Sequence, residues 1–371
     1  MWMRDRITTA MLALLLGGGG IACNGASPGT DAGGAGADAG VDAGPPVDPS
    51  SAHFVISTQS GDGPWARWGF VVARIDDSTA ILLGGTDANS SGVGQTFQDT
   101  WRVSVDADGT LTATPVAGAE AGSRYCACAA YDSARNVVVV FGGRTLDVSA
   151  LPPNTWELDL GTETWTEITG ATQPPGSLGC AMAYDEGTGR TYMFGGAAMT
   201  GAYGSTWRYE PTMGEWVEVV GAGPLARYDG VLFPSPADDG TLMLFGGSYG
   251  ATGAAFYGDV WRFDPQDETW SEIVMANEPP GRRTAWLVRD PDRNGFYAGF
   301  GTDGRMEALG DFFYADLETM SWSSIEIPFD DGPANRGFSP ALPGGPSSLG
   351  TLNAGSGATG GALQDAWRLV R

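Results

Sequence analysis

The pattern of apolar and polar positions divides the chain into a short N-terminal apolar run, a polar stretch and a long repetitive body. Beyond residue 51, apolar runs of strand length recur, of which Val137–Phe141 is the clearest, and most end in a pair of glycines. Turn-forming pairs such as Tyr131-Asp132 and Tyr184-Asp185 come shortly before these runs. Continuous apolar runs of this length are typical of strands buried on both faces. The body is therefore expected to be all-β.

A unit of about 54 residues repeats through this body. Glycine pairs lie at 84–85, 142–143, 195–196 and 246–247, and single glycines at 301 and 355 mark weaker fifth and sixth copies. A tryptophan follows each pair, at 101, 156, 207, 261 and 367, with Phe313 in its place in the fifth copy. A second tryptophan comes nine residues after the first, at 165, 216, 270 and 322. Each unit has room for four short strands, which describes one blade of a radial repeat protein.

The glycine pair followed by two tryptophans resembles the kelch repeat family. The resemblance implies a kelch-type β-propeller of six blades over residues 52–371. The sixth copy ends soon after its first tryptophan, at Arg371, whereas His53-Phe54-Val55-Ile56 precedes the first copy and belongs to no unit. We expect this N-terminal segment to complete the last blade, since such an exchange leaves no open sheet edge and closes the ring.

The N-terminus predicts export. Arg4 and Arg6 precede a ten-residue apolar run that is too short to span a bilayer, so residues 1–22 are expected to form a signal peptide. The run leads to Ile21-Ala22-Cys23, which resembles the lipobox of bacterial lipoproteins and implies lipidation at Cys23; ordinary cleavage nearby is the alternative, because Gly20 stands where that box usually has Leu. Asn24 favours an outer-membrane lipoprotein of the cell envelope, facing the periplasm or the surface.

Residues 23–51 are expected to contain this lipidated cysteine and a disordered linker. The stretch consists almost wholly of Gly, Ala, Asp, Pro and Ser, a composition that cannot bury enough apolar surface to order itself. A flexible chain of this length spans about 25–30 Å, enough to hold a domain clear of a membrane. Its acidic repeats could bind calcium loosely, although a solvated spacer is the favoured interpretation; no other cofactor and no metal site is expected.

Composition excludes several classes of chemistry. The chain has 371 residues with 20 Arg, no Lys and a single His, His53, and its net charge is −24. Schiff-base lysines, Ser-His-Asp triads and histidine-rich metal sites require residues that this chain mostly or wholly lacks. The negative charge argues against nucleic acid as a partner, because DNA and RNA are bound through clustered basic residues. The membrane is expected to be contacted through the lipid anchor only, and the protein is expected to be a monomer.

The kelch unit commonly opens with Pro followed shortly by Arg. Five arginines fit this place, and in the register of other kelch propellers they would surround one mouth of a central channel: Arg67, Arg124, Arg227, Arg283 and Arg336. Guanidinium groups bind carboxylates and phosphates bidentately, so the set predicts a site for an acidic glycan, an acidic peptide or another anion. The alternative is that each Arg bonds within its own blade or to the next one, since the pattern repeats with the blade.

The loops that follow the glycine pairs should gather on the same face as these arginines. They carry Tyr203, Tyr249 and Tyr257, whose rings could stack on a sugar or a peptide or could simply pack the loops. The expected function is therefore binding of a protein or an acidic ligand without catalysis. A sugar-modifying enzyme of the sialic acid epimerase type and a structural or adhesive envelope protein are the alternatives.

Three cysteines remain in the body. In an exported protein a disulfide is plausible, and counting back from the glycine pairs places Cys180 opposite Cys126 or Cys128 on neighbouring blades. We therefore predict a bond between blades from Cys180 to Cys128, or else to Cys126. Buried thiols and a Cys-x-Cys metal site are the alternatives.

Overall fold

The computed structural model describes most of the repetitive body. The described residues are 48–88, 94–116, 121–144, 151–198, 200–250, 255–305, 307–327, 336–337, 341–342, 350–353, 356–357 and 365–370. The predicted signal peptide, Cys23 and the linker up to residue 47 lie outside them. The last linker residues form a single turn of 3-10 helix, η1 (Pro49–Ser51).

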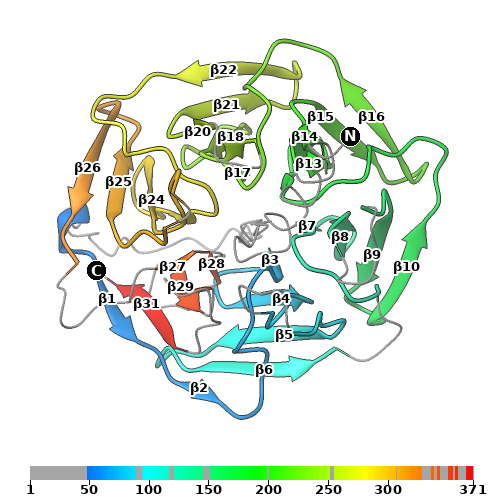
Figure 1. Cartoon of the computed structure of the whole chain (residues 1–371), viewed down its shortest axis with the longest axis horizontal. Helices are drawn as coiled ribbons and strands as arrows, with labels where there is room; N and C mark the ends of the chain where they lie inside the picture. The colour runs from blue at the N-terminus through cyan, green and yellow to red at the C-terminus, as the bar shows by residue number, and fades with distance from the viewer. Residues whose placement is uncertain are drawn as a thin grey trace, which may run out of the picture.

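Antiparallel four-stranded sheets stand around a common axis, which makes the fold an all-β propeller (Figure 1). Five sheets are complete blades, each built from one continuous stretch of chain. From the axis outward, the first blade contains β3 (Val71–Arg74), β4 (Thr79–Leu83), β5 (Thr100–Val105) and β6 (Leu111–Pro115), and the second contains β7 (Cys128–Asp132), β8 (Val137–Phe141), β9 (Thr155–Asp159) and β10 (Thr164–Ile168). The third contains β11 (Ala181–Asp185), β12 (Arg190–Phe194), β15 (Thr206–Glu210) and β16 (Glu215–Val219), and the fourth contains β17 (Val231–Pro234), β18 (Leu242–Phe245), β21 (Val260–Asp264) and β22 (Thr269–Ile273). The fifth contains β23 (Trp286–Arg289), β24 (Gly295–Gly299), β25 (Phe312–Asp316) and β26 (Ser321–Ile325).

A further sheet joins the two ends of the chain. It contains β28 (Ala341–Leu342), β29 (Gly350–Asn353), β31 (Ala366–Val370) and β1 (His53–Ile56) in that order. The predicted pairing of residues 53–56 with the C-terminal strand is found, in the register His53 to Val370 through Ile56 to Trp367.

The prediction of six blades is not confirmed, since the structure has five complete blades. The strand nearest the axis in the terminal sheet, β28, has only two residues. Pro340, Pro343 and Pro346 flank it, and proline lacks the amide hydrogen that a strand inside a sheet donates. The sequence therefore shortens this strand where the other copies have four or five residues.

Short two-stranded antiparallel sheets extend beyond the blades. Two are hairpins, β13 (Ala197–Ala198) with β14 (Gly201–Ala202) and β19 (Ser248–Tyr249) with β20 (Ala255–Phe256), and the third pairs β27 (Arg336–Gly337) with β30 (Ser356–Gly357). In addition, β2 (Gln59–Ser60) adds a fifth, parallel strand to the outside of the first blade.

The glycine pairs let neighbouring blades approach each other. Gly84 and Gly85 have φ of 62° and 93°, in the left-handed region that favours glycine. A Cβ at Gly84 would lie 2.2 Å from the carbonyl oxygen of Arg124 in the next blade, and the Gly85 amide donates to that oxygen over 2.9 Å. In the fifth blade Phe300 and Gly301 occupy these two positions, one residue earlier than the sequence suggested, and Phe300 takes the left-handed conformation with φ of 53°.

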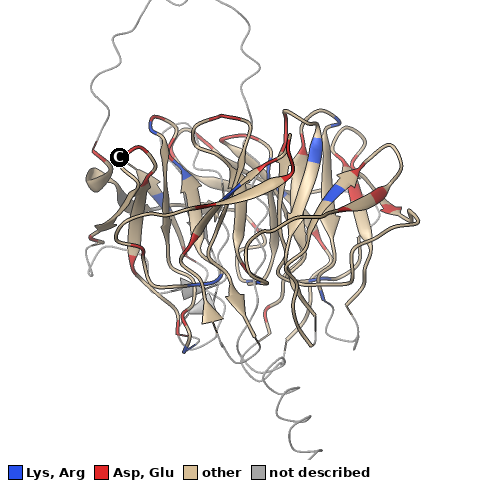
Figure 2. Cartoon of the chain, turned by 90° about the horizontal axis from the view of Figure 1, so that it is seen from above, with Lys and Arg blue, Asp and Glu red and all other residues tan. Residues whose placement is uncertain are grey.

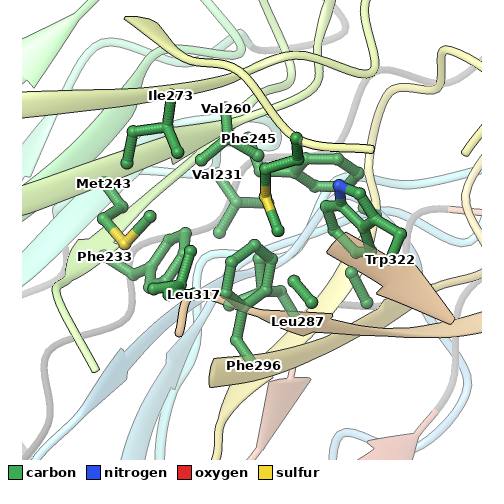
Figure 3. Packing of buried hydrophobic residues seen from close by; sticks show 14 residues of the cluster. Val231, Phe233, Met243, Phe245, Val260, Ile273, Leu287, Phe296, Leu317 and Trp322 are labelled. Carbon is green, nitrogen blue, oxygen red and sulfur yellow. The ribbon is translucent and has the colours of Figure 1, made fainter. Parts of the chain in front are cut away.

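Apolar side chains fill the spaces between adjacent sheets. Between the fourth and fifth blades, Phe233 and Phe245 pack on Phe296 and Trp322, with ring centroids 5.0 to 6.2 Å apart (Figure 3). A second cluster packs Phe54 of β1 against Trp286 and Phe312 of the fifth blade. The core therefore follows the ring as a series of clusters between blades, which is how radial repeats bury their apolar surface.

A backbone hydrogen-bond chain runs from blade to blade near the axis. Five residues with positive φ, one before each innermost strand, donate and accept in series: Gly69, Cys126, Gly179, Asp229 and Thr284. From Cys126 onward, each of the four amides donates to the carbonyl of the preceding member over 2.7 to 3.0 Å. These bonds fix the spacing of the blades around the axis.

The two faces of the ring differ in composition. We call the face with the glycine pairs and the loops that follow them the doublet face, and the opposite face, with the tight turns between strands, the turn face. Almost every tight turn carries two or more carboxylates, and acidic segments accordingly lie along the edge near the C-terminus in Figure 2. The turn face is therefore strongly acidic.

Candidate functional site

The predicted ligand-binding arginines are mostly used inside their own blades. Arg67 makes a bidentate ion pair with Asp99, with nitrogen-to-oxygen distances of 2.6 and 3.0 Å, and its Nη1 donates to the Gly84 carbonyl over 2.9 Å. Arg227 does the same with Asp259, at 2.6 and 2.9 Å. Both guanidinium groups are buried. The Nη1 and Nη2 donors of both side chains are therefore engaged within the blade.

In the fifth blade Arg282, not the predicted Arg283, holds this place. Arg282 pairs with Asp311 over 2.7 and 2.8 Å and donates to the Phe300 carbonyl over 3.1 Å. The consecutive prolines 279 and 280 and consecutive arginines 282 and 283 allowed two alignments, and the fold uses the earlier one. The prediction of Arg283 for this position is therefore wrong, and Arg282 occupies it.

Each of these guanidinium groups also lies over an aromatic ring of its own blade. Arg67 Cζ is 4.0 Å from the ring centroid of Phe97, and Arg227 Cζ is 4.0 Å from that of Tyr257. Cation–π contact of this kind adds to the ion pair. Tyr257, which was predicted to bind ligand, thus packs on Arg227, and burial raises the pKa of its hydroxyl.

The second blade lacks the carboxylate. Asn154 occupies the position of Asp99 and Asp259, and Arg124 donates only to backbone carbonyls, of which that of Gly142 is 3.0 Å away. Burial without a close carboxylate lowers the pKa of Arg124 to about 10. In the first and fourth blades the tryptophan two positions later donates from its indole Nε1 to this carboxylate. In the second blade the indole Nε1 of Trp156 is buried without a hydrogen bond.

The remaining predicted residues are dispersed. In the third blade Ser177 stands where the others have Arg, and Tyr203 pairs through its backbone with Gly196 and Arg227. Tyr249, in β19, is 44% exposed. Arg336 lies in β27, and its side chain is outside the described part of the chain.

A further set of residues lies closer to the axis, and the sequence analysis named only Arg283 among them. These residues directly follow the Arg position in each blade and pair with the residue after the glycine pair: Trp68, Tyr125, Leu178, Tyr228 and Arg283. The rings of Trp68 and Tyr125 meet edge to face at 5.7 Å, and burial raises the pKa of Tyr125 to about 12. The set is mainly apolar, so the repeat places a packed apolar layer where an anion site was expected.

Arg283 is therefore an axial residue with a local role. Its Nη1 donates to the Tyr228 hydroxyl over 2.9 Å and lies 3.8 Å from a carboxylate oxygen of Asp229. Asp229 is buried, neither of its oxygens accepts a hydrogen bond, and burial raises its pKa well above the usual range. This pair is the one strongly polar contact that we find among the described axial residues.

A disulfide joins the innermost strands of the second and third blades. It links Cys128 to Cys180, the first of the two pairings predicted, with the Cα atoms 5.6 Å apart. Cys126 is a buried thiol outside this bond.

Within the described ranges, no three His, Cys, Asp or Glu side chains lie together as metal ligands would. The described helical residues include no segment long and apolar enough to cross a membrane.

Comparison with known proteins agrees with this architecture. Residues 69–285 match the family model for the KLHDC2/KLHL20/DRC7 Kelch-repeats domain. The chain belongs to the kelch-repeat family. A relative from Oryza sativa subsp. japonica, Adagio-like protein 1, is 24% identical over 275 residues, which cover 65% of this chain and 41% of that protein. The chain thus spans less than half the length of that relative.

Membership of the kelch-repeat family suggests a protein-interaction module. Among the described residues, four large apolar side chains on the doublet face are exposed: Val220 at 93%, Leu225 at 67%, Val274 at 77% and Tyr249 at 44%. The loops belong to the third and fourth blades and to the connection into the fifth. We call these four residues the apolar surface.

Proposed function

We propose that the kelch propeller binds a protein partner through the apolar surface of its doublet face. The exposure of Val220, Leu225, Tyr249 and Val274 carries this proposal. Exposed apolar side chains that gather on one face of a soluble domain mark interaction sites, because burying them against a partner removes apolar area from water. Kelch domains generally act in protein interactions, which supports the same assignment.

A protein partner is favoured over an acidic sugar. The sequence-based case for an acidic glycan, and for an enzyme of the epimerase type, relied on a ring of available guanidinium groups. Arg67, Arg227 and Arg282 are buried in bidentate ion pairs, and Arg124 is bound to carbonyls. The apolar side chains around them suit a protein surface better than a charged sugar.

We also propose that the propeller is exported and tethered through a lipid on Cys23, with the residues before 52 acting as signal peptide and spacer. The apolar run before Cys23 and the Gly, Ala and Asp composition after it support this proposal. Labelling of growing cells with a radioactive fatty acid tests it. Label on the wild-type chain that is absent from Cys23→Ser is expected, and equal label on both chains would refute the anchor.

We further propose that the terminal sheet is a sixth blade. Phe54 and Leu369 pack on the fifth blade, whereas Leu342 and Ala366 pack on the first, so the sheet has the two neighbours that a blade requires. An experimental density map of the purified protein tests the count. Six radial sheets are expected, and five would refute it.

Site-specific photo-cross-linking tests the binding proposal. A photoreactive residue is placed at Leu225 on the doublet face or at Met213 on the turn face, which are 67% and 59% exposed and so provide a matched pair. The full chain is used in its own cells. We expect one protein to be captured from position 225 and not from position 213, and Val274→Ser to reduce that adduct. The same adducts from both positions, or no effect of Val274→Ser, would contradict the proposal.

A further inference from the structure

A pocket of about 390 Å³ opens on the turn face between three consecutive blades. Its wall is formed by the β11–β12 turn, by the β17–β18 turn and by the end of β23. The residues that matter for its chemistry are Tyr184, Asp185, Glu186, Pro234, Asp238 and Arg289. A cavity of this size is large enough to hold a side chain or a small ligand.

Asp185 is a buried carboxylate that faces this pocket. It is only 5% exposed, and its Oδ2 accepts hydrogen bonds from the Thr188 amide over 2.7 Å and from the Thr188 hydroxyl over 2.6 Å. Among the described residues no Arg or His nitrogen lies within 4.0 Å of it. A carboxylate this deeply buried is ordinarily paired with a cation.

The neighbouring blade shows what is missing. Asp132 ends β7 just as Asp185 ends β11, and Arg135 pairs with it over 2.6 Å. The residue three positions after Asp185 is Thr188 rather than Arg, so the third blade keeps the carboxylate and lacks its internal counter-charge. Asp185, the carboxylate that lacks this counter-charge, lines the pocket.

The rest of the pocket suits a cation on an apolar stem. The positive charge of Arg289 is already neutralised by its ion pair with Asp238 at the rim. Glu186 accepts a hydrogen bond from the Ser133 hydroxyl of the second blade over 3.0 Å and adds a second negative charge to the turn that holds Asp185. The side chain of Pro234 provides apolar wall, along which a hydrocarbon stem can lie, whereas the ring of Tyr184 packs between the second and third blades.

We propose that this pocket binds an arginine or lysine side chain of a protein partner, with Asp185 as its counter-charge. The acidic turn face would steer a basic segment toward the pocket, because opposite charge raises the rate of encounter. The pocket is on the turn face and the apolar surface is on the doublet face, so the failure of one proposal would not refute the other.

Titration of the full chain with N-acetylarginine amide, followed by ligand-detected NMR, tests the proposal. The neutral isostere N-acetylcitrulline amide and methylguanidinium, which lacks the long stem, are the comparison probes. We expect saturable binding of the arginine probe and at least tenfold weaker binding of both others. Equal binding of citrulline would overturn the role of charge, and equal binding of methylguanidinium would overturn the assignment to a protein side chain.

Variants assign the binding to Asp185. D185N removes the charge at nearly constant volume and is expected to weaken the arginine probe at least tenfold. Asp159→Asn is the matched control, because Asp159 also accepts backbone hydrogen bonds in a tight turn and lies outside the pocket. Thr188→Arg keeps Asp185 and supplies the guanidinium internally, as Arg135 does for Asp132, so it should abolish binding without unfolding the protein. Unchanged affinity in both D185N and Thr188→Arg would refute the proposal.

Discussion

The second blade predicts that a single substitution will stabilise the protein. Asn154→Asp places a carboxylate where the first, fourth and fifth blades have one. The buried Arg124 guanidinium and the indole Nε1 of Trp156 then gain a carboxylate partner. The substitution also removes the amide oxygen of Asn154, which is buried without a hydrogen bond. The backbone at this position has the same arrangement in every complete blade, because its carbonyl accepts a hydrogen bond from the amide of the residue that follows the second strand, as Asn154 does from Gly142 and Asp99 does from Gly84.

The expected gain is about 2 kcal/mol. A hydrogen bond to a charged group contributes about 1.5–3 kcal/mol net, and a buried NH without a partner costs about 1–3 kcal/mol. Against this stand the loss of the 3.0 Å bond from Asn154 to Glu167 and the repulsion between two carboxylates, together about 1 kcal/mol at an exposed site. For a domain of this size, a gain of about 2 kcal/mol corresponds to a rise of roughly 3 °C in Tm, measured by calorimetry.

A double-mutant cycle identifies the cause. In an Arg124→Met background most of the gain should disappear, because the new carboxylate then has no guanidinium to pair with. The reciprocal change Asp259→Asn converts the fourth blade to the arrangement of the second and should cost about 3 kcal/mol, since it leaves Arg227 buried without its carboxylate. An unchanged or lower Tm for Asn154→Asp, or a gain that persists without Arg124, would refute this account of the Arg positions.

Three further predictions concern the ring itself. The disulfide closes a loop of 52 residues, so its loss in Cys128→Ser should cost about 4 kcal/mol by loop entropy, and peptide mapping should find the bond to Cys180 intact in Cys126→Ser. Asp229→Asn should stabilise the protein at neutral pH: burial raises the pKa of Asp229, so its stabilising contribution is present below the unfolded pKa of about 3.9 and is lost as pH rises through the folded value. The difference in Tm between Asp229→Asn and wild type should therefore grow from pH 4 upward, and a constant difference would contradict the buried state of Asp229. Gly195→Ala should lower Tm by several degrees, since φ is 71° and a Cβ there would lie 2.3 Å from a carbonyl oxygen of the next blade, whereas Gly221→Ala, which has open space, is its control.

The fold was predictable because each blade repeats the same physical requirements. Val137–Phe141 had to be buried on both faces, and the left-handed pair Gly142 and Gly143 marks where the next blade approaches. The closing pair of β1 and β31 followed from the incomplete last copy. The number of complete blades did not follow, because the sequence pattern of the last copy does not reveal how far its prolines shorten β28.

The candidate site was less predictable, because a periodic residue has the same appearance in the sequence whether it serves the blade or a ligand. Arg67 and Arg227 satisfied the expected spacing, yet Asp99 and Asp259, two positions before a tryptophan, take up their charge. The informative signal was departure from the repeat. Asn154 in place of Asp, and Thr188 in place of Arg, identify the positions where the surface differs from blade to blade.

The pairing of β1 with β31 also determines how the propeller would respond to mechanical load. A pull on the chain before residue 53 acts first on β1, which is held by its pairing with β31. The Phe54 ring lies within 6 Å of the rings of Trp286, Phe300 and Phe312, so detaching β1 would also require withdrawing that ring from the fifth blade. Tension along the N-terminal chain is therefore shared between two sheets before it can open the ring.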